Sequence, residues 1–224
     1  PSLPAAELAA ARAFCAELGV AHHAVPTREL DREGYRRNGP DRCYFCKATL
    51  LETATEVAAA GGFAAIATGT NASDVAAGFR PGIRAAAERG ARTPLADLGL
   101  DKSAVRDIAR AWGLPTADKP AAACLSSRIA YGVGITRSRL ARVERAEVAL
   151  RPLVTGFGVR NLRVRDLGET VRLEVDAAAV PAVRDHPPVR EAIRAAGFGE
   201  APLTVEPFRS GSMNELLPDP ERWR

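Results

Sequence analysis

The sequence predicts an α/β protein with two domains: a parallel-sheet domain over residues 1–120 and a smaller α+β domain over residues 121–224. Three observations lead to this prediction. The chain is 46% apolar and 26% charged, as ordinary globular proteins are. Helical and strand-like patterns alternate in the first half, which favours a parallel sheet wrapped by helices. Beyond residue 120 a long helix is followed by strands of alternating polarity, which places a domain boundary there.

In the first half, apolar residues at helical spacing predict four helices and short apolar runs predict two strands. The helices are expected at 3–18, 41–60, 83–89 and 101–112, and the strands at 20–25 and 63–67. Gly19, Gly61 and Gly113 stand where helices would end. No strand with a glycine-rich turn opens this half, and the chain begins at Pro1, so we expect that an N-terminal portion is missing.

In the second half, the pattern predicts helices at 137–153 and 188–196 and strands at 161–165, 170–175 and 203–207. Gly168 stands between the first two strands, where a tight turn would join them.

Composition and charge exclude several classes of function. No apolar run reaches the length of about 18 residues that a membrane helix needs, and no secretory leader opens the sequence. The net charge is +4, but the basic residues are spread along the chain, and aromatic residues make up only 5%. Such a pattern does not favour a nucleic-acid surface. We therefore expect a cytoplasmic protein without nucleic-acid or membrane partners.

The cysteines form the first chemical candidate. Cys43 and Cys46 form a C-x-x-C pair in the first turn of a predicted helix, a position that favours thiolates. The pair could also be two half-buried helix residues. A closed zinc site lacks ligands in this sequence, whereas three cysteines with one open position, counting Cys124, suit a [4Fe–4S] cluster.

Cys124 is also a candidate nucleophile. Small residues surround it, and Lys119 and Arg128 lie nearby in the sequence. Small neighbours would let a substrate approach, and the cations would favour a thiolate. A buried small apolar residue is an equally good interpretation.

Two further groups could bind ligands. Gly69, Thr70, Asn71 and Asp74 follow a predicted strand, at the edge where α/β folds place ligands, although an ordinary capped turn explains them as well. Arg163 and Arg165 share one strand face, which indicates either anion binding or a solvated surface. Glu147 and Glu174 could pair with these arginines or be surface carboxylates.

Taken in order, five motifs resemble the LarE family of ATP-dependent sacrificial sulfur transferases, within the PP-loop ATP pyrophosphatase superfamily. The resemblance covers essentially the whole chain. The motifs are Asp41-Arg42-Cys43-Tyr44-Phe45-Cys46-Lys47, Gly69-Thr70-Asn71, Arg80-Pro81-Gly82, Asp118-Lys119-Pro120-Ala121-Ala122-Ala123-Cys124-Leu125-Ser126-Ser127-Arg128 and Ser210-Gly211-Ser212-Met213-Asn214.

The resemblance implies an adenylating domain followed by a domain that completes the substrate site. The family uses ATP and Mg²⁺ to activate a carboxylate of pyridinium-3,5-dicarboxylate mononucleotide, and sulfur then replaces the activated oxygen. This step serves the nickel-pincer cofactor of lactate racemase. The resemblance also implies a homo-oligomer. In one branch a single cysteine gives up its sulfur, and in another three cysteines hold a [4Fe–4S] cluster.

By position, Cys124 matches the sacrificial or cluster cysteine, and Cys43 and Cys46 match the additional cluster pair. Gly69, Thr70, Asn71 and Asp74 are implied to bind ATP. The residues implied to shape the substrate and phosphate pocket are Ser127, Arg128, Glu147, Arg163, Arg165 and Glu174. Because all three thiols are present, the cluster is the favoured sulfur source.

The sequence departs from the family pattern in three places. The PP-loop motif Ser-Gly-Gly-x-Asp-Ser does not occur in the 224 residues, so we expect that this chain alone does not hydrolyse ATP. Gly78 and Phe79 stand where the family has an acidic residue, and residues 151–160 form a longer stretch than usual. Another PP-loop ligase, or an inactive remnant or cluster-holding protein, is the alternative function.

Overall fold

The computed structural model describes residues 2–120, 122–209 and 211–217. These residues form two compact units. The unit that we call the sheet unit comprises the described residues of 1–23, 36–38 and 123–217, and the helical unit comprises those of 24–35 and 39–122. The chain therefore enters the sheet unit three times.

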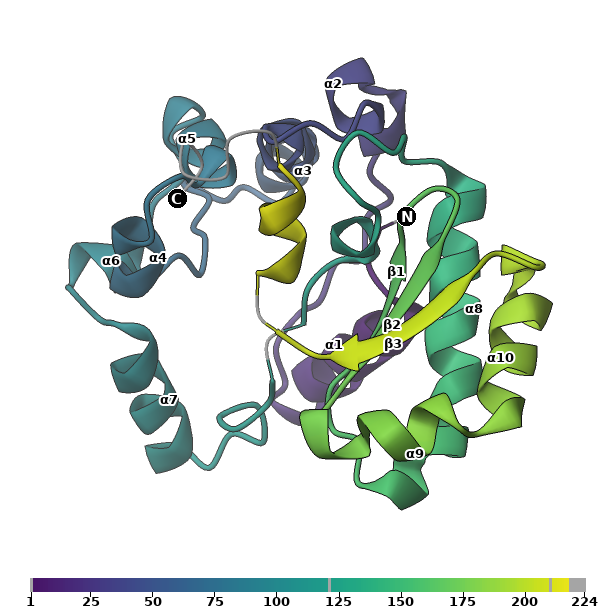
Figure 1. The fold of residues 1–224 in the computed structure, drawn as a ribbon. Coiled ribbons are helices and arrows are strands. Elements are labelled where there is room, and N and C mark those ends of the chain that lie inside the picture. Colours follow the sequence, from purple (N-terminus) through teal and green to yellow (C-terminus); the bar gives the residue numbers. More distant parts are fainter. Residues whose placement is uncertain (1, 121, 210, 218–224) are drawn as a thin grey trace. The chain divides into compact units, whose positions relative to one another are not determined.

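A three-stranded sheet organises the sheet unit (Figure 1). Strand β1 (Leu162–Asp166) pairs antiparallel with β2 (Val171–Val175), and β2 pairs parallel with β3 (Leu203–Pro207). Gly168 takes a φ of 94° in the turn between β1 and β2. A side chain is strained in that conformation, which explains the glycine.

The two faces of this sheet differ in polarity because successive side chains of a strand point to opposite faces. One face carries buried aliphatic residues, among them Leu162, Val164, Leu173 and Val175. The other face carries Arg163, Arg165, Arg172, Glu174, Thr204 and Glu206, which the strand register brings together. The charged face therefore comes directly from the alternation in the sequence.

Helices bury the apolar side of the sheet unit. Helix α8 (Arg137–Val154) packs against β1, and α10 (Pro187–Ile193) packs against α8. Figure 1 shows both helices beside the sheet. The buried side chains of α8 are Leu140, Val143, Ala146, Leu150 and Val154. Their spacing of three or four residues is that of one helix face.

Shorter elements complete the sheet unit. These are α1 (Ala5–Glu17), α9 (Val180–Arg184) and the short helical segments η2 (Leu125–Arg128), η3 (Thr155–Phe157), η4 (Ala177–Ala179), η5 (Arg194–Phe198) and η6 (Ser212–Leu216). The buried Asn38 fastens the loop after η2: its Nδ2 donates to the carbonyls of Ala130 at 2.7 Å and Val133 at 2.9 Å.

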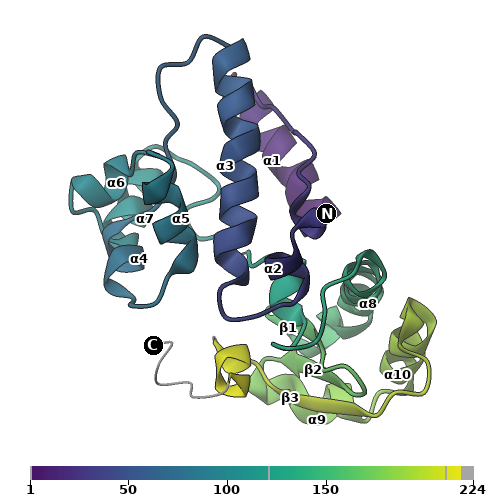
Figure 2. The ribbon, with the colours of Figure 1, turned by 90° about the horizontal axis from the view of Figure 1, so that it is seen from above.

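The helical unit consists of helices and loops. Its elements are η1 (Glu29–Asp31), α2 (Glu33–Arg36, whose last residue belongs to the sheet unit), α3 (Arg42–Ala60), α4 (Ala72–Ala76), α5 (Pro81–Glu88), α6 (Pro94–Asp97) and α7 (Lys102–Ala111). Helices α3 and α5 pack side by side (Figure 2). Gly82 contributes to this contact, because a Cβ at that position would lie 3.4 Å from the Cys43 carbonyl oxygen.

The predicted helices and the three strands of the second half are confirmed, and no end shifts by more than three residues. The strands predicted at 20–25 and 63–67 are wrong. Residues 20–25 lie exposed in a loop, and Phe63 is 62% exposed. Only an isolated bridge between Ala67 and Arg92 forms there. Runs that are rich in alanine present too little apolar surface to hold a strand against a helix.

Consequently, the described part of the helical unit contains no β-sheet, although the sequence predicts a parallel one for that half. The chain as a whole remains α/β. None of the helices within residues 2–120, 122–209 and 211–217 is long and apolar enough to cross a membrane.

Candidate functional site

The loop around Cys124 forms the centre of the candidate site in the sheet unit. Cys124 is half-buried and directly precedes η2. Its carbonyl oxygen accepts hydrogen bonds from the Ser127 backbone N–H at 3.0 Å and from the Ser127 hydroxyl at 2.7 Å. The next amide, of Leu125, donates to the carbonyl of Ser2 at 2.8 Å. The peptide group that follows Cys124 is thus held at both its carbonyl and its amide.

Arg128 closes this loop from its buried side. Its side chain is 4% exposed and forms an ion pair with Glu147 of α8, with Nε at 3.0 Å and Nη2 at 3.3 Å from the two carboxylate oxygens. Its Nη1 donates to the carbonyls of Ala123 and Cys124, the latter at 2.9 Å. Glu147 also accepts the backbone N–H of Val164 at 3.1 Å. Buried charges need this kind of complete pairing.

A second buried ion pair lies on the charged face of the sheet. Arg165 donates from Nε and Nη2 to one oxygen of Glu174, at 2.9 and 2.6 Å. The other oxygen of Glu174 accepts the Ser212 hydroxyl at 2.8 Å, and Arg165 also donates to the Ser127 carbonyl at 3.2 Å. Arg165 stands opposite Arg172 in the register, so it reaches the carboxylate diagonally. Like charges directly opposite each other repel, which explains the diagonal pairing.

Arg163 differs from Arg128 and Arg165 because it is only half-buried. Its Nη1 donates to the Leu162 carbonyl at 2.8 Å, and its guanidinium lies 5.7 Å from the centroid of the Phe208 ring. Burial, together with the charges of Arg128, Arg165 and Arg151, lowers the pKa of Arg163 below its ordinary value, while Glu147 acts in the opposite sense. The guanidinium therefore lies among other cations. Such a field favours an anion.

The structure thus brings together seven of the residues predicted from the sequence. All of them lie in the sheet unit, on η2, α8, β1 and β2 or directly before η2: Cys124, Ser127, Arg128, Glu147, Arg163, Arg165 and Glu174. Chemically, this arrangement offers a thiol on a hydrogen-bonded loop and, in the same cluster, a half-buried guanidinium in a positive field. It can place a sulfur atom beside a ligand that carries a phosphate or a carboxylate.

Cys43 and Cys46 belong to the helical unit. Both lie in the first two turns of α3, where Cys43 is exposed and Cys46 half-buried. Tyr44 lies between the two cysteines in the sequence. The guanidinium of Arg84, on α5, lies 4.9 Å from the centroid of the Tyr44 ring. No group of three or more histidine, cysteine or acidic side chains among the described residues is arranged to hold a metal ion. Cys124 belongs to the sheet unit, so the three-thiol site that the sequence predicts would draw on both units and stays a prediction.

The predicted ATP loop is also part of the helical unit. Asn71 caps α4: its side chain accepts the Asp74 N–H at 3.1 Å, and the Asp74 carboxylate accepts the Asn71 N–H at 3.3 Å. Two of the four predicted side chains are thus engaged in a capping box. The hydroxyls of Thr68 and Thr70 share a hydrogen bond of 2.9 Å, and a Cβ at Gly69 would meet open space.

The sequence does not single out three residues that contribute to the site. Ser212 binds both members of the buried Arg165–Glu174 pair. It stands in the last quoted motif, which was the available signal, while Ser210 of that motif and Ala121 lie outside the described residues. Phe208 beside Arg163 and the buried Asn38 carry no local sequence signal, because their partners are distant in the chain.

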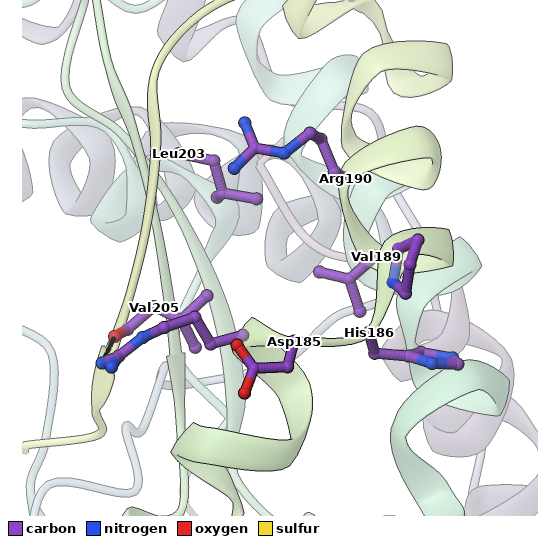
Figure 3. A pocket seen from close by; sticks show the side chains of 8 residues that line it. Asp185, His186, Val189, Arg190, Leu203 and Val205 are labelled. Atoms are coloured by element: carbon purple, nitrogen blue, oxygen red, sulfur yellow. Dashed lines mark hydrogen bonds between the residues drawn. The ribbon is translucent and has the colours of Figure 1, made fainter.

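A pocket of about 280 Å³ opens elsewhere in the sheet unit, between β3 and the segment that joins α9 to α10 (Figure 3). The aliphatic side chains of Val189, Leu203 and Val205 line it, with Arg190 at one end. Arg184 donates to the Val205 carbonyl at 3.2 Å at its edge. None of the residues predicted from the sequence lines this pocket, and its charged side chains are exposed.

Known proteins similar to this chain come from three organisms. An uncharacterized protein of Synechocystis sp. is 40% identical over 220 residues, which cover 97% of this chain and 80% of that protein. The pyridinium-3,5-bisthiocarboxylic acid mononucleotide synthase of Lactiplantibacillus plantarum is 31% identical over 210 residues, 92% of this chain and 74% of the synthase. An uncharacterized protein of Methanocaldococcus jannaschii is 27% identical over 174 residues, 78% of this chain and 66% of that protein.

No protein-family model matches the chain. The similarity to the synthase nevertheless extends through both units and through the Cys124 loop, and its coverage leaves little of the chain unmatched. The chain therefore belongs to the LarE family.

Proposed function

We propose that this chain is a sulfur transferase that converts an adenylated carboxylate of pyridinium-3,5-dicarboxylate mononucleotide into a thiocarboxylate, in the synthesis of the nickel-pincer cofactor. The observation that carries the proposal is the buried charged cluster beside Cys124, in a chain 31% identical to a synthase of the corresponding bisthiocarboxylic acid. The name of that relative states the product of a double sulfur transfer.

The reaction divides into two steps. A carboxylate oxygen of the substrate attacks the α-phosphorus of ATP, so that pyrophosphate leaves and an acyl adenylate forms. A sulfur nucleophile then attacks the acyl carbon, and AMP leaves with the electron pair of the broken C–O bond. Splitting the reaction in this way gives the carbonyl a good leaving group before sulfur arrives.

Within this scheme, Arg163 contacts the substrate phosphate. It is the half-buried arginine of the cluster, and Arg128 and Arg165 surround it with positive charge. Arg165, held by Glu174 and Ser127, contributes through its charge and fixes the strand that carries Arg163. A planar guanidinium, whose donors form a fixed fork, suits a phosphate group.

The sulfur source in our proposal is a [4Fe–4S] cluster held by Cys43, Cys46 and Cys124. None of the three cysteines forms a disulfide within the described residues, and the first two lie at i and i+3 of one helix, on the same side. When bound, such a cluster would supply a sulfide on the iron that no cysteine ligates. The chain's own part is to present the three thiolates, and the Cys124 loop holds its thiol in the sheet unit.

ATP and Mg²⁺ complete the proposal. Gly69 and Thr70, with Asn71 and Asp74 at the start of α4, are proposed to contact the nucleotide, since the loop leaves open space above Gly69. The Ser-Gly-Gly-x-Asp-Ser motif that would cradle the phosphates does not occur in these 224 residues. A homo-oligomeric state and a cytoplasmic location stay predictions.

The proposal is tested by following the product. The purified protein is incubated anaerobically with iron, sulfide and the preformed acyl adenylate of the dicarboxylate mononucleotide, because this chain alone is not expected to hydrolyse ATP, and the thiocarboxylate is detected by mass spectrometry. We expect Cys124→Ala to abolish product formation, while Cys15→Ala, a matched change of a half-buried cysteine in the same unit, keeps it. Product formation by the Cys124→Ala protein would refute the proposal, and no product from any version would favour an inactive remnant.

A further inference from the structure

Every nitrogen of the Arg128 side chain donates a hydrogen bond inside the protein. Both of its terminal nitrogens and Nε donate to protein acceptors: two oxygens of Glu147, the carbonyls of Ala123 and Cys124, and the Ser127 hydroxyl at 3.3 Å. The residue is 3% exposed. A guanidinium has five N–H donors, so this set leaves little capacity for a ligand.

The bonds of Arg128 connect the cysteine loop to the rigid part of the unit. Glu147 lies on α8, the helix that packs against β1, and it also accepts the N–H of Val164 in that strand. The path therefore runs from the helix through Glu147 and Arg128 to the two peptide carbonyls on either side of the Cys124 Cα. These two carbonyls define the orientation of the Cys124 residue.

We propose that Arg128 and Glu147 form a brace that positions Cys124 for sulfur transfer, and that they do not contact the substrate. This assignment replaces the substrate-binding role that the sequence predicts for both residues. The contrast with Arg163 supports it, because Arg163 is half-buried and lies beside Phe208, whereas Arg128 is enclosed. The inference rests on the proposed function only in the role it gives to Cys124.

The variants must separate a brace from a general contribution to stability. Arg128→Met alone would leave the Glu147 carboxylate buried without its partner, which can prevent folding. The double variant Arg128→Met/Glu147→Gln removes both charges, keeps similar volumes and retains an acceptor for the Val164 N–H. Arg128→Lys keeps the charge but not the fork of donors. The matched control is Arg139→Met, which removes one arginine from Asp166 while Arg142 keeps its two bonds to that carboxylate.

The first readout is the rate at which iodoacetamide alkylates Cys124 in the reduced, iron-free protein, measured peptide by peptide, with Cys15 as the internal reference. We expect the double variant to raise the Cys124 rate about tenfold, which is the effect of removing one charge-assisted hydrogen bond from a closed loop. The Cys124 alkylation rate of Arg128→Lys should lie between those of the unaltered protein and the double variant. Arg139→Met should leave the rate unchanged. The Cys15 rate and the unfolding midpoint should stay close to those of the unaltered protein.

The inference is overturned if the Cys124 rate in the double variant stays within about twofold of the unaltered rate, or if the Cys15 rate rises in parallel, because a brace acts locally. A second readout uses turnover: the double variant should lower kcat with little change in KM, whereas a substrate contact would raise KM. The alkylation result does not depend on sulfur transfer. If Cys124 proves dispensable for product formation, the proposed function fails while the brace can still be measured.

Discussion

The two units of the molecule carry similar proportions of charged side chains in very different settings. In the sheet unit, Arg165 and Glu174 pair with side chains 7% and 1% exposed. In the helical unit, Arg110 pairs with Asp107 and Asp118 while all three remain about half exposed or more. Burial makes the first kind of pair strict in its geometry and costly to break, and solvent makes the second kind weak.

This difference originates in the hydrophobic pattern of each unit. Strands β1 and β2 alternate polar and apolar residues, so that helices cover one face and the short segments η2 and η6 contribute residues to the charged face. In the helical unit, alanine-rich helices bury few large side chains, and α7 buries none. The comparison teaches that the side chains with fixed positions lie around Cys124, where a buried apolar core supports them.

The largest effect is expected from breaking the buried pair. Arg165→Met leaves the buried Glu174 carboxylate without the guanidinium that pairs with it, and we expect it to lower the free energy of unfolding by about 3–5 kcal/mol. Arg110→Met, the exposed counterpart in the helical unit, should change it by less than about 1 kcal/mol. Chemical denaturation of both variants measures the difference. Equal effects at the two sites would remove the distinction between the units.

Core packing should give the next largest effect. Leu173, on the apolar face of β2, is fully buried, and Leu173→Ala should cost about 2–5 kcal/mol of unfolding free energy. Phe63 lies in the segment where a buried strand was predicted but is 62% exposed, so Phe63→Ala should change stability by less than about 0.5 kcal/mol. A loss of several kcal/mol on changing Phe63 would mean that the segment is a buried strand after all.

The role of Arg163 is tested by ligand binding and not by stability. Arg163→Ala should weaken binding of the mononucleotide substrate about ten- to a hundredfold, because one charge-assisted phosphate contact contributes roughly 1.5–3 kcal/mol. Calorimetric titration gives the affinity, and Arg151→Ala, which removes a charge that acts on Arg163, is the control. If Arg163→Ala binds the mononucleotide with unchanged affinity, Arg163 is a solvated surface residue and not a phosphate contact.

The smallest effect concerns the loop of the helical unit. Asn71→Ala removes one half of the capping box of α4 and should cost about 0.5–2 kcal/mol, whereas Asn71→Asp retains the acceptor and should cost little. Comparing the two variants in ATP binding separates a cap from a nucleotide contact. If both variants bind ATP equally well, the cap explains Asn71 fully.

Much of the sheet unit was predictable because its signals are local. The alternation in β1 and β2, the apolar spacing in α8 and the glycine at 168 each specify their own segment. The helical unit shows where such reasoning fails: a short apolar run such as 63–67 becomes a strand only if a neighbouring strand and helix cover it, and no local feature reports their presence.

The sequence predicts which residues belong to the candidate site, but it does not predict which of them pair with each other. Periodicity indicates that Arg163 and Arg165 share a face, yet it cannot indicate that Arg165 is enclosed by Glu174 and Ser212 while Arg163 is half-exposed. Likewise, proximity in sequence suggests that Arg128 acts on the Cys124 thiol. In the structure it acts on the Cys124 carbonyl, because Glu147 draws its guanidinium to α8.

The central claim is that Cys124 takes part in sulfur transfer without being consumed, together with Cys43 and Cys46. Intact-mass spectrometry of the protein after reaction with the preformed acyl adenylate of the dicarboxylate mononucleotide tests it most directly. The account predicts an unchanged polypeptide mass, intact Cys124 and no product from Cys43→Ala or Cys46→Ala. A protein lighter by one hydrogen sulfide, with dehydroalanine at position 124 and with Cys43→Ala and Cys46→Ala still active, would contradict it.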